Sequence, residues 1–256
     1  MIAYLLRSLV QAAIVLLAVA LLAFSMFRFV GDPIANLAGQ EATQADREEL
    51  RKHLGLEDSI LVQFGRFVGG AVKGEFGISY KQGRKVSDLL AERLPATLEL
   101  ALLSTILATA LGIAFGVYTA IRRDGFIANA IMVLSLVGVS LPTFIIGIGL
   151  IYLFAVELKW LPSYGRGDVS SFGWWTTGLL TESGRRSLVL PVLTLGFFQL
   201  TLIMRLVRSE MLEVLRTDFI KFARARGIDE RKINFRHALR NTLIPVVTIA
   251  GLQLGG

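Results

Sequence analysis

Apolar residues in this chain gather in long runs that hold few charges, rather than alternating with polar residues at short intervals. A helix rises about 1.5 Å per residue, so about 20 apolar residues cross the hydrocarbon core of a bilayer. Runs of that length predict membrane spans at 9–30, 96–121, 126–156 and 187–207. A fifth apolar run, 242–256, offers only 15 residues and predicts a span that is incomplete in this chain. The predicted fold class is an all-α, polytopic membrane helical bundle.

The first apolar run is interpreted as a span that stays in the protein, with a cleaved signal peptide as the alternative. One charge, Arg7, precedes the run, and no A-x-A cleavage site follows it. The run also exceeds the 7–15 apolar residues that are usual in signal peptides. Both features favour the uncleaved span.

Basic residues between the spans predict which side of the membrane each segment faces. Cytoplasmic loops are enriched in Lys and Arg, and the chain clusters them in 122–125 and in 208–241. Counting spans backward from these segments puts the N-terminus in the cytoplasm and segments 34–94 and 157–186 outside. The second outer segment carries aromatic residues suited to a membrane interface, namely Trp160, Tyr164, Trp174 and Trp175.

The predicted organisation has three parts: a first span in 1–30, an extracytoplasmic helical segment in 31–95, and a membrane core in 96–256. Within 31–95, one helix is expected after Thr43 and before Gly55, with Asp46 at the capping-box position and Leu50 and Leu54 on one face. A second helix is expected from its apolar spacing at Leu61, Phe64, Val68 and Val72. This segment is interpreted as a packed outer cap, with direct contact to a soluble partner as the alternative.

The amino-acid composition limits the kinds of site that this chain can hold. The chain is 54% hydrophobic and 18% charged, below the roughly 25% charged residues of ordinary soluble domains. Cysteine is absent, and the two histidines, His53 and His237, lie far apart in sequence. No metal site is therefore expected. The formal net charge of +7 is explained by the basic segments that orient the chain.

Three residues that interrupt the apolar spans are candidates for a translocation path. Glu99 follows Pro95 closely, so a cap in the first turn of the second span is favoured over a path role. Gln199 lies deeper and either lines a polar path or bonds across helices. Pro142 interrupts the third span as a hinge or as a static kink. No Asp, Lys or Arg is placed in the middle of a span.

Catalytic motifs are missing from the sequence. There is no G-x-x-x-x-G-K-[ST] phosphate loop, no G-x-S-x-G elbow and no H-E-x-x-H pair. We assign no catalytic residues and expect a conduit, not an enzyme. Without charged residues in mid-span, an external motor is favoured over an ion-gradient-driven carrier or channel, which stays as the alternative. Nucleic acid is not an expected partner, because the basic segment offers few aromatic residues for stacking.

The segment 208–241 reads as a short helix, a tight turn and a second helix that enters the fifth span. Gly227 is suited to end the short helix in a left-handed conformation. Asp229 is suited to cap the second helix at its N-terminus.

The whole chain resembles the membrane subunits of binding-protein-dependent ABC importers, in the branch for dipeptides, oligopeptides, glutathione and nickel. The resemblance rests on an ordered series of short motifs: GDP at 31–33, HLGLE at 53–57, GEFGIS at 74–79, LPATLELA at 94–101, SLPTF at 140–144, LPS at 161–163, LPVLTLG at 190–196, MLEVLRTDFIKFARARG at 211–227 and HALRNTLIPVVT at 237–248. It implies a type I ABC importer permease fold with six spans, continuing past Gly256.

The family's cytoplasmic motif has the form EAA-x3-G-x9-I-x-L-P. This chain keeps Ala223, Gly227 and Leu239 and departs from the motif at Lys221, Phe222, His237 and Arg240. The resemblance implies a coupling helix that docks on an ATPase through Phe219, Ile220, Phe222, Ala223, Arg224, Ala225, Arg226 and Gly227. It also implies that the link to span five runs through His237, Leu239, Arg240 and Asn241.

The resemblance further implies the partners. They are a second homologous permease subunit, two cytoplasmic ATPase subunits that hold ATP and Mg, an extracytoplasmic solute-binding protein and the lipid of a bacterial or archaeal cytoplasmic membrane. No cofactor is expected in this chain. Whether the solute is a dipeptide, an oligopeptide, glutathione or nickel stays open at this point.

Overall fold

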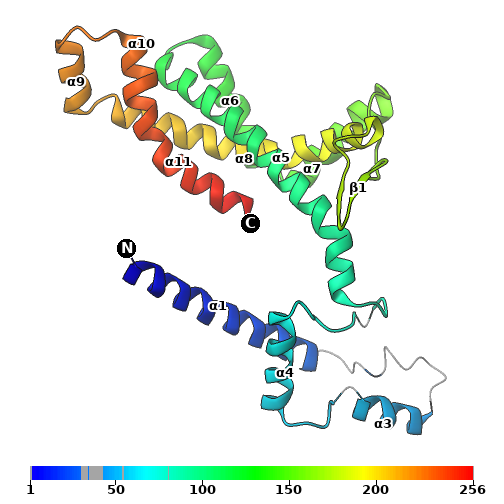
Figure 1. Cartoon of the computed structure of the whole chain (residues 1–256). Helices are drawn as coiled ribbons and strands as arrows, with labels where there is room; N and C mark the ends of the chain where they lie inside the picture. Colours follow the sequence, from blue (N-terminus) through cyan, green and yellow to red (C-terminus); the bar gives the residue numbers. More distant parts are fainter. Residues whose placement is uncertain (1, 30–33, 35–42, 54, 80, 256) are drawn as a thin grey trace. The chain divides into compact units, whose positions relative to one another are not determined.

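The computed structural model describes residues 2–29, 34, 43–53, 55–79 and 81–255 (Figure 1). The chain forms two compact units, Met1–Arg93 and Leu94–Gly256. Helices make up nearly all of the regular structure in both units, so the predicted all-α class is confirmed.

The first unit consists of α1 (Ile2–Phe29), α3 (Gln44–His53), α4 (Ile60–Val72) and the first turns of α5. Phe24 of α1 contacts Phe64 and Phe67 of α4, with ring centroids 5.6 and 6.0 Å apart. The helix α4 therefore packs on α1, the first predicted span. Gly55 ends α3 with φ 63°. The motif at 31–33, the residue Leu54 and the side chains of Asp46 and Leu50 lie outside the described residues.

Two long helices dominate the second unit, α5 (Val86–Ile121) and α8 (Glu182–Val214). They approach closely because α5 presents glycines to α8. A Cβ built on Gly112 would lie 2.8 Å from Cγ2 of Ile203, and one on Gly116 would lie 2.6 Å from Cβ of Val207. Small residues of this kind let helix backbones come together in a membrane. Ile203 and Val207 are fully buried and belong to the core of this unit.

The third predicted span is broken rather than kinked. α6 (Phe126–Ser140) is followed by α7 (Thr143–Ile151) and the π-helical η1 (Tyr152–Glu157), and the two halves meet at 107°. Leu141 is extended, with φ −93° and ψ 133°. The cause is Pro142, because a proline ring disfavours the helical conformation in the residue before it. The interruption at Pro142 is confirmed, and the crossing of the membrane by 126–156 as one span stays a prediction.

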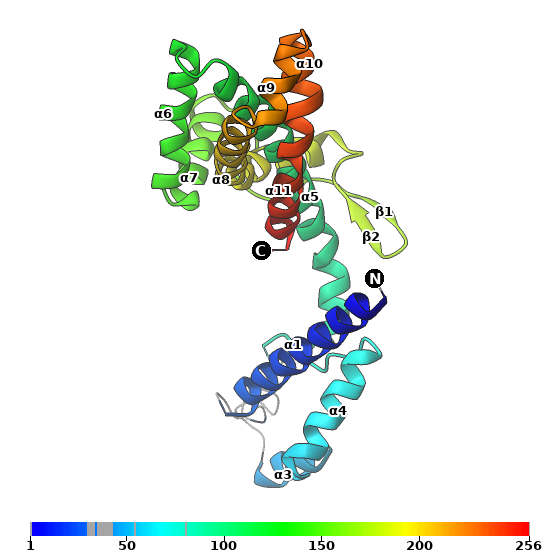
Figure 2. The ribbon, with the colours of Figure 1, turned by 90° about the vertical axis from the view of Figure 1, so that its left-hand side faces the viewer.

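A β-hairpin occupies the segment before α8. Strands β1 (Ser170–Phe172) and β2 (Trp175–Thr177) pair antiparallel, with Ser170 opposite Thr177, and they project together in Figure 2. Gly173 turns the chain with φ 63°. A glycine at the first position of a two-residue loop is the pattern of a type II′ hairpin turn, a signal that was not used in the sequence analysis.

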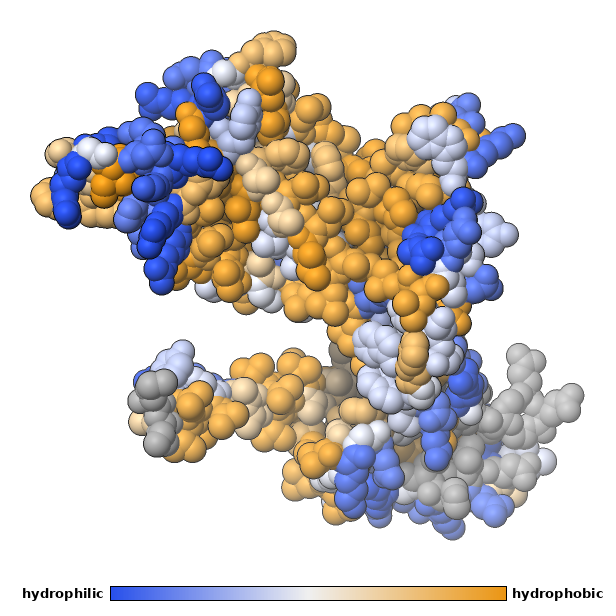
Figure 3. Space-filling view, turned by 45° about the horizontal axis from the view of Figure 1, so that its top comes forward, coloured by the Kyte–Doolittle hydropathy of each residue, from blue (hydrophilic) through white to orange (hydrophobic). Residues whose placement is uncertain are grey.

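The chain after α8 continues through α9 (Asp218–Ala225), a glycine turn, α10 (Glu230–Lys232), the π-helical η2 (Ile233–Ala238) and α11 (Leu239–Leu254). Figure 2 shows α10 and α11 as one uninterrupted rod. In Figure 3 the bundle around α5 and α8 is mostly hydrophobic, and hydrophilic residues gather near α9 and α10 and near the hairpin. Among the described residues, three helices are long and apolar enough to cross a membrane, and the broken α6–α7 pair makes a fourth candidate.

Candidate functional site

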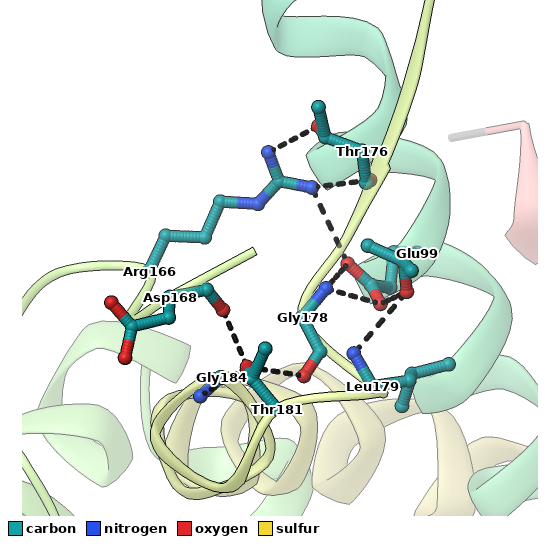
Figure 4. A network of polar contacts seen from close by, with 9 residues as sticks. Glu99, Arg166, Asp168, Thr176, Gly178, Leu179, Thr181 and Gly184 are labelled. Atoms are coloured by element: carbon teal, nitrogen blue, oxygen red, sulfur yellow. Dashed lines mark hydrogen bonds and ion pairs between the residues drawn. The ribbon is translucent and has the colours of Figure 1, made fainter. Parts of the chain in front are cut away.

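A buried carboxylate ties the hairpin segment to the outer part of α5. The Glu99 side chain is 3% exposed and accepts four hydrogen bonds from three residues of the hairpin segment. The Thr177 hydroxyl donates to Oε1 at 2.7 Å, and the Gly178 N–H donates to both oxygens at 3.2 and 3.3 Å. The Arg166 guanidinium lies 3.5 Å from Oε2, close enough for an ion pair (Figure 4). Charge and hydrogen bonds thus compensate the burial of this acid.

This geometry overturns the interpretation of Glu99 as a first-turn cap. The helix begins at Val86, so Pro95 lies inside it and Glu99 lies beyond the first turn. Pro95 was expected to mark the helix start, but the chain tolerates it within α5. Glu99 instead serves as an acceptor for a neighbouring segment. Its assignment to a translocation path stays a prediction.

The hairpin segment is also fixed to the start of α8. The Thr181 hydroxyl accepts from the Gly184 N–H and caps α8, and it donates to the Asp168 carbonyl. Gly184 leaves no room for a side chain, because a Cβ there would meet the Gly178 carbonyl. Arg166 spans the hairpin by donating to the Thr176 hydroxyl at 2.8 Å and to its carbonyl at 2.7 Å. The segment is therefore clamped between two spans.

Gln199 and Pro142 occupy different places in the core unit. The Thr105 hydroxyl of α5 donates to Oε1 of Gln199 on α8 at 3.2 Å, so Gln199 bonds across helices, as one of its two interpretations expected. Pro142 stands at the start of α7, and its carbonyl accepts from the Ile145 N–H at 3.0 Å. Their assignment to a translocation path, like that of Glu99, stays a prediction.

The short helix α9 has one face buried in its own subunit and one face open. Ile220 and Ala223 are buried and belong to the core cluster. Phe219 and Phe222 are 45% and 64% exposed. Ile220 and Ala223 therefore anchor α9 in its own subunit, and their assignment as direct docking contacts stays a prediction. The open face retains Phe219, Phe222 and the predicted contacts Arg224, Ala225 and Arg226.

The C-terminal end of α9 turns as expected. Gly227 adopts φ 75°, the left-handed conformation that glycine accepts without strain. The Asp229 carboxylate accepts from the Arg231 N–H and caps α10, which confirms that expectation. Nε of Arg224 donates to Glu230 at 2.7 Å across the turn, and this contact raises the pKa of Arg224. The guanidinium of Arg226 lies over the Phe222 ring at 5.7 Å.

The predicted link to the last helix lies in η2 and the first turn of α11. Leu239 packs against the core cluster, whereas Arg240 and Asn241 are exposed. Nδ2 of Asn241 donates to the His237 carbonyl at 3.0 Å, within the helix. No break separates this link from α11.

Sequence reasoning missed Arg205. It lies inside the predicted span 187–207, and Nε donates to the Ser135 hydroxyl of α6 at 3.4 Å. No Asp, Lys or Arg was expected in the middle of a span, and Arg205 lies near the predicted end of this one, whereas α8 itself continues to Val214. The usable signal was the spacing of the polar residues Thr194, Thr201 and Arg205, which recur on one face of a helix.

The core unit combines a broken third span, close glycine contacts between α5 and α8, and the short helix α9 before a continuous helical rod. These features are typical of polytopic membrane transport proteins. Comparison with known families narrows it further. The model of the family "Binding-protein-dependent transport system inner membrane component" matches residues 112–256, and the model of its N-terminal region matches residues 1–101. The chain belongs to this family, whose members are permease subunits of ABC importers.

Named relatives agree with this membership. The chain is 38% identical to a peptide transport system permease protein of Brucella abortus, over 100% of the chain and 81% of the relative. It is 37% identical to the oligopeptide transport system permease protein AppB of Bacillus subtilis, over 99% of the chain and 79% of the relative. It is 32% identical to the dipeptide transport system permease protein DppB of Alkalihalophilus pseudofirmus, over 100% and 80%.

Proposed function

We propose that this chain forms one half of the translocation path of an ATP-driven importer for short peptides. Three relatives from different organisms are named for transport of peptides, oligopeptides or dipeptides. A second, homologous permease subunit completes the path in this proposal. An extracytoplasmic binding protein delivers the solute, and two cytoplasmic ATPase subunits hold ATP and Mg.

The observation that carries the proposal is the construction of α9. Its inner face is anchored by Ile220 and Ala223, and its outer face presents Phe219 and Phe222 to a partner. Exposed aromatic side chains at a small convex surface are suited to insertion into a groove of another protein. α9 thus acts as the coupling helix of the importer and docks on the ATPase.

The proposed motion follows from the connection between α9 and the membrane. Gly227 turns the chain, and a continuous helix then runs from Glu230 through η2 into α11. A rigid rod transmits displacement without absorbing it. Closure of the ATPase subunits on ATP would move α9, and α11 would move with it, opening and closing the path.

Orientation follows from the same proposal. If α9 docks on a cytoplasmic ATPase, the Arg122–Gly125 connection also faces the cytoplasm, because the chain crosses the membrane twice between them, once in the broken α6–α7 span and once in α8. The N-terminus then lies in the cytoplasm, and the hairpin of β1 and β2 lies outside, where the binding protein docks.

The docking step is tested with the substitution Phe222→Glu. The complex is purified through this subunit, and the ATPase subunits that accompany it are quantified. We expect at least about a tenfold loss of ATPase and of dipeptide uptake into vesicles, because a desolvated aromatic anchor is replaced by a charge. Membrane insertion should be unchanged, since Phe222 is exposed in the isolated subunit.

Phe235→Glu is the matched control. Phe235 is 54% exposed on η2 and lies outside α9, so its substitution should leave ATPase retention near the wild-type level. Equal losses from both variants would contradict docking through α9. Retention of the ATPase subunits by both variants would also contradict docking through α9. Uptake that depends on an ion gradient alone would contradict the ATP-driven mechanism.

A further inference from the structure

Arg205 is the one strongly basic side chain that lies well inside a described span, between the two residues of α8 that pack on the glycines of α5. Ile203 faces Gly112 and Val207 faces Gly116. These glycines are nine and five residues from Ile121, the end of α5 at the Arg122–Gly125 connection. At about 1.5 Å per residue, Arg205 therefore lies between about 8 and 14 Å from that end.

A second helix gives the same depth. Arg205 donates to Ser135 of α6, and Ser135 is nine residues from Phe126, where α6 leaves the same connection. That separation corresponds to about 14 Å along α6. Since the hydrocarbon core is about 30 Å thick, the Arg205 guanidinium lies near its middle.

The side chain points deeper instead of back toward the nearer surface. In a helix the Cα–Cβ bond tilts toward the N-terminus, and the N-terminus of α8 lies at the opposite end from the Arg122–Gly125 connection. The hydrogen bond to Ser135 agrees with this direction. Arg205 therefore does not extend to the nearest lipid headgroups, which is the usual solution for a basic residue near a span end.

Most of the hydrogen-bonding capacity of this guanidinium is unused. Arginine has five N–H donors, and within the described part of the chain only Nε of Arg205 has a partner. That hydrogen bond is weak, because the distance between Nε and the Ser135 hydroxyl is 3.4 Å. No ion pair of Arg205 is found among the described residues.

The face of α8 that carries Arg205 stays polar toward the Arg122–Gly125 end. Ser209 and Leu212 follow Arg205 at intervals of four and three residues on one face of α8, and Arg216 lies in the turn just after the helix ends at Val214. Together with Glu213 they line an open hollow of about 380 Å³. A solute that leaves Arg205 would meet this hollow next. Arg205 itself is half-buried, so the unused N–H groups are reachable.

We propose that Arg205 binds the carboxylate of the transported solute as it passes through the membrane. This inference rests on the proposed function, because a free peptide always carries a C-terminal carboxylate. A guanidinium matches a carboxylate with two parallel hydrogen bonds, and the two terminal nitrogens of Arg205 are free to form them. Ionisable groups in a membrane interior mark solute pathways when no internal partner neutralises them.

The test uses the complete transporter in liposomes, with wild-type, Arg205→Gln, Arg205→Lys and Arg186→Gln subunits. Arg186 lies on the same helix, is 61% exposed and pairs with Glu182, so its substitution is the matched control. Uptake of alanyl-alanine and of its C-terminal amide is measured per occupied binding protein, which removes discrimination by that protein. We expect Arg205→Gln to lower uptake of the free acid about tenfold and to leave the amide within about twofold. Arg205→Lys should retain part of the acid uptake.

A second measurement does not depend on delivery of the amide. The chain has no cysteine, so Arg205→Cys introduces a single thiol into this subunit. A cationic methanethiosulfonate reagent should restore uptake of the free acid, whereas a neutral reagent of similar size should not. Restoration by both reagents, or by neither, would overturn the proposal.

The outcomes separate this inference from the proposed function. If Arg205→Gln lowers acid and amide uptake equally, Arg205 is structural and the proposed function still stands. If Arg205→Gln loses the second permease subunit on purification, the guanidinium pairs with a carboxylate of that subunit and the inference is overturned. If the wild-type complex hydrolyses ATP in response to the binding protein but takes up no peptide, the peptide assignment and this inference both fail.

Discussion

Removing the Glu99 carboxylate is expected to release the hairpin segment from α5 without unfolding the bundle. Glu99→Ala leaves the Thr177 hydroxyl and the Gly178 N–H without their acceptor, and it removes the ion-pair partner of Arg166. The remaining contacts of the segment, from Thr181 and Arg166, are within the segment or to α8. The effect should therefore be local to 165–181.

The size of the effect follows from burial. A buried donor left without an acceptor costs about 1–3 kcal/mol. With two such donors, the Thr177 hydroxyl and the Gly178 N–H, the free-energy cost of Glu99→Ala is about 3 kcal/mol. The ion pair adds less, since the Arg166 side chain is 29% exposed and water compensates part of its loss. Glu99→Gln keeps one acceptor oxygen and should cost about half as much.

Hydrogen exchange of fragments that cover 170–181 measures this change directly. Opening of the segment exposes the amides of Gly178 and Leu179, which are hydrogen-bonded to Glu99 and to the Thr177 hydroxyl in the closed state. Since about 1.4 kcal/mol is a factor of ten, Glu99→Ala should speed exchange about 100-fold and Glu99→Gln about tenfold.

The control is Glu92→Gln, which makes the same charge change on the same helix. The Glu92 carboxylate pairs with Arg84 at 3.0 Å, but both side chains are more than half exposed. Such a pair contributes at most about 1 kcal/mol, and its loss should not reach 170–181. If Glu99→Ala and Glu92→Gln give the same exchange in this segment, the idea that Glu99 holds the hairpin is refuted.

Three further substitutions test the packing and the coupling turn. Gly116→Val should destabilise the bundle by about 1–3 kcal/mol, because the new side chain meets Val207 and the Met204 carbonyl. The expected result is a lower melting temperature in detergent. Gly149→Ala is the control and should leave the melting temperature unchanged, because open space surrounds Gly149. Gly227→Ala should lower the stability of the turn by about 1–2 kcal/mol, because residue 227 adopts a φ of 75°. The expected result is faster proteolysis after α9, and unchanged proteolysis would contradict the left-handed turn. Glu230→Gln should lower stability by less than about 1 kcal/mol because its pair with Arg224 is exposed, and a larger loss in a melting experiment would show that the turn depends on this pair.

Hydropathy predicted the helices that lie wholly in apolar surroundings. The spans expected at 9–30, 96–121 and 187–207 correspond to α1, α5 and α8, although each helix extends beyond its apolar run. The extensions of α5 and α8 carry several charged residues, and their helical state depends on local caps and packing. Thr181, for example, caps α8 six residues before the apolar run begins. A capping residue outside an apolar run can be recognised in the sequence, but only when the helix start is sought there.

The turn after α9 was predictable because its determinants are local. Gly227 and Asp229 act on the backbone within a few residues of themselves, one by accepting a left-handed conformation and the other by accepting an N–H. The role of Glu99 was not predictable in this way. Its donors, such as Thr177, lie 78 residues away in sequence. Nothing near Glu99 indicates that a hairpin will cover it.

The face of α9 that is buried also depends on distant residues. Phe219, Ile220 and Ala223 recur at the spacing of one helical face, but only Ile220 and Ala223 belong to the core cluster of α5, α8 and α11. A phenylalanine at the boundary of an apolar stripe is buried or exposed according to the shape of its neighbours. Phe219 and Phe222 therefore lie on the exposed side of α9.

Arg205 links the glycine packing to the proposed path. Its depth is set by the register of α8 on α5, which the contacts of Gly112 with Ile203 and of Gly116 with Val207 hold in place. A slip of one helical turn would move the guanidinium by about 5.4 Å, away from Ser135 and toward one membrane surface. Substitutions at Gly116 should therefore weaken discrimination between a peptide acid and its amide even where the subunit still folds. If a Gly116 variant folds, transports and keeps full discrimination between acid and amide, the register of α8 on α5 does not determine the position of Arg205.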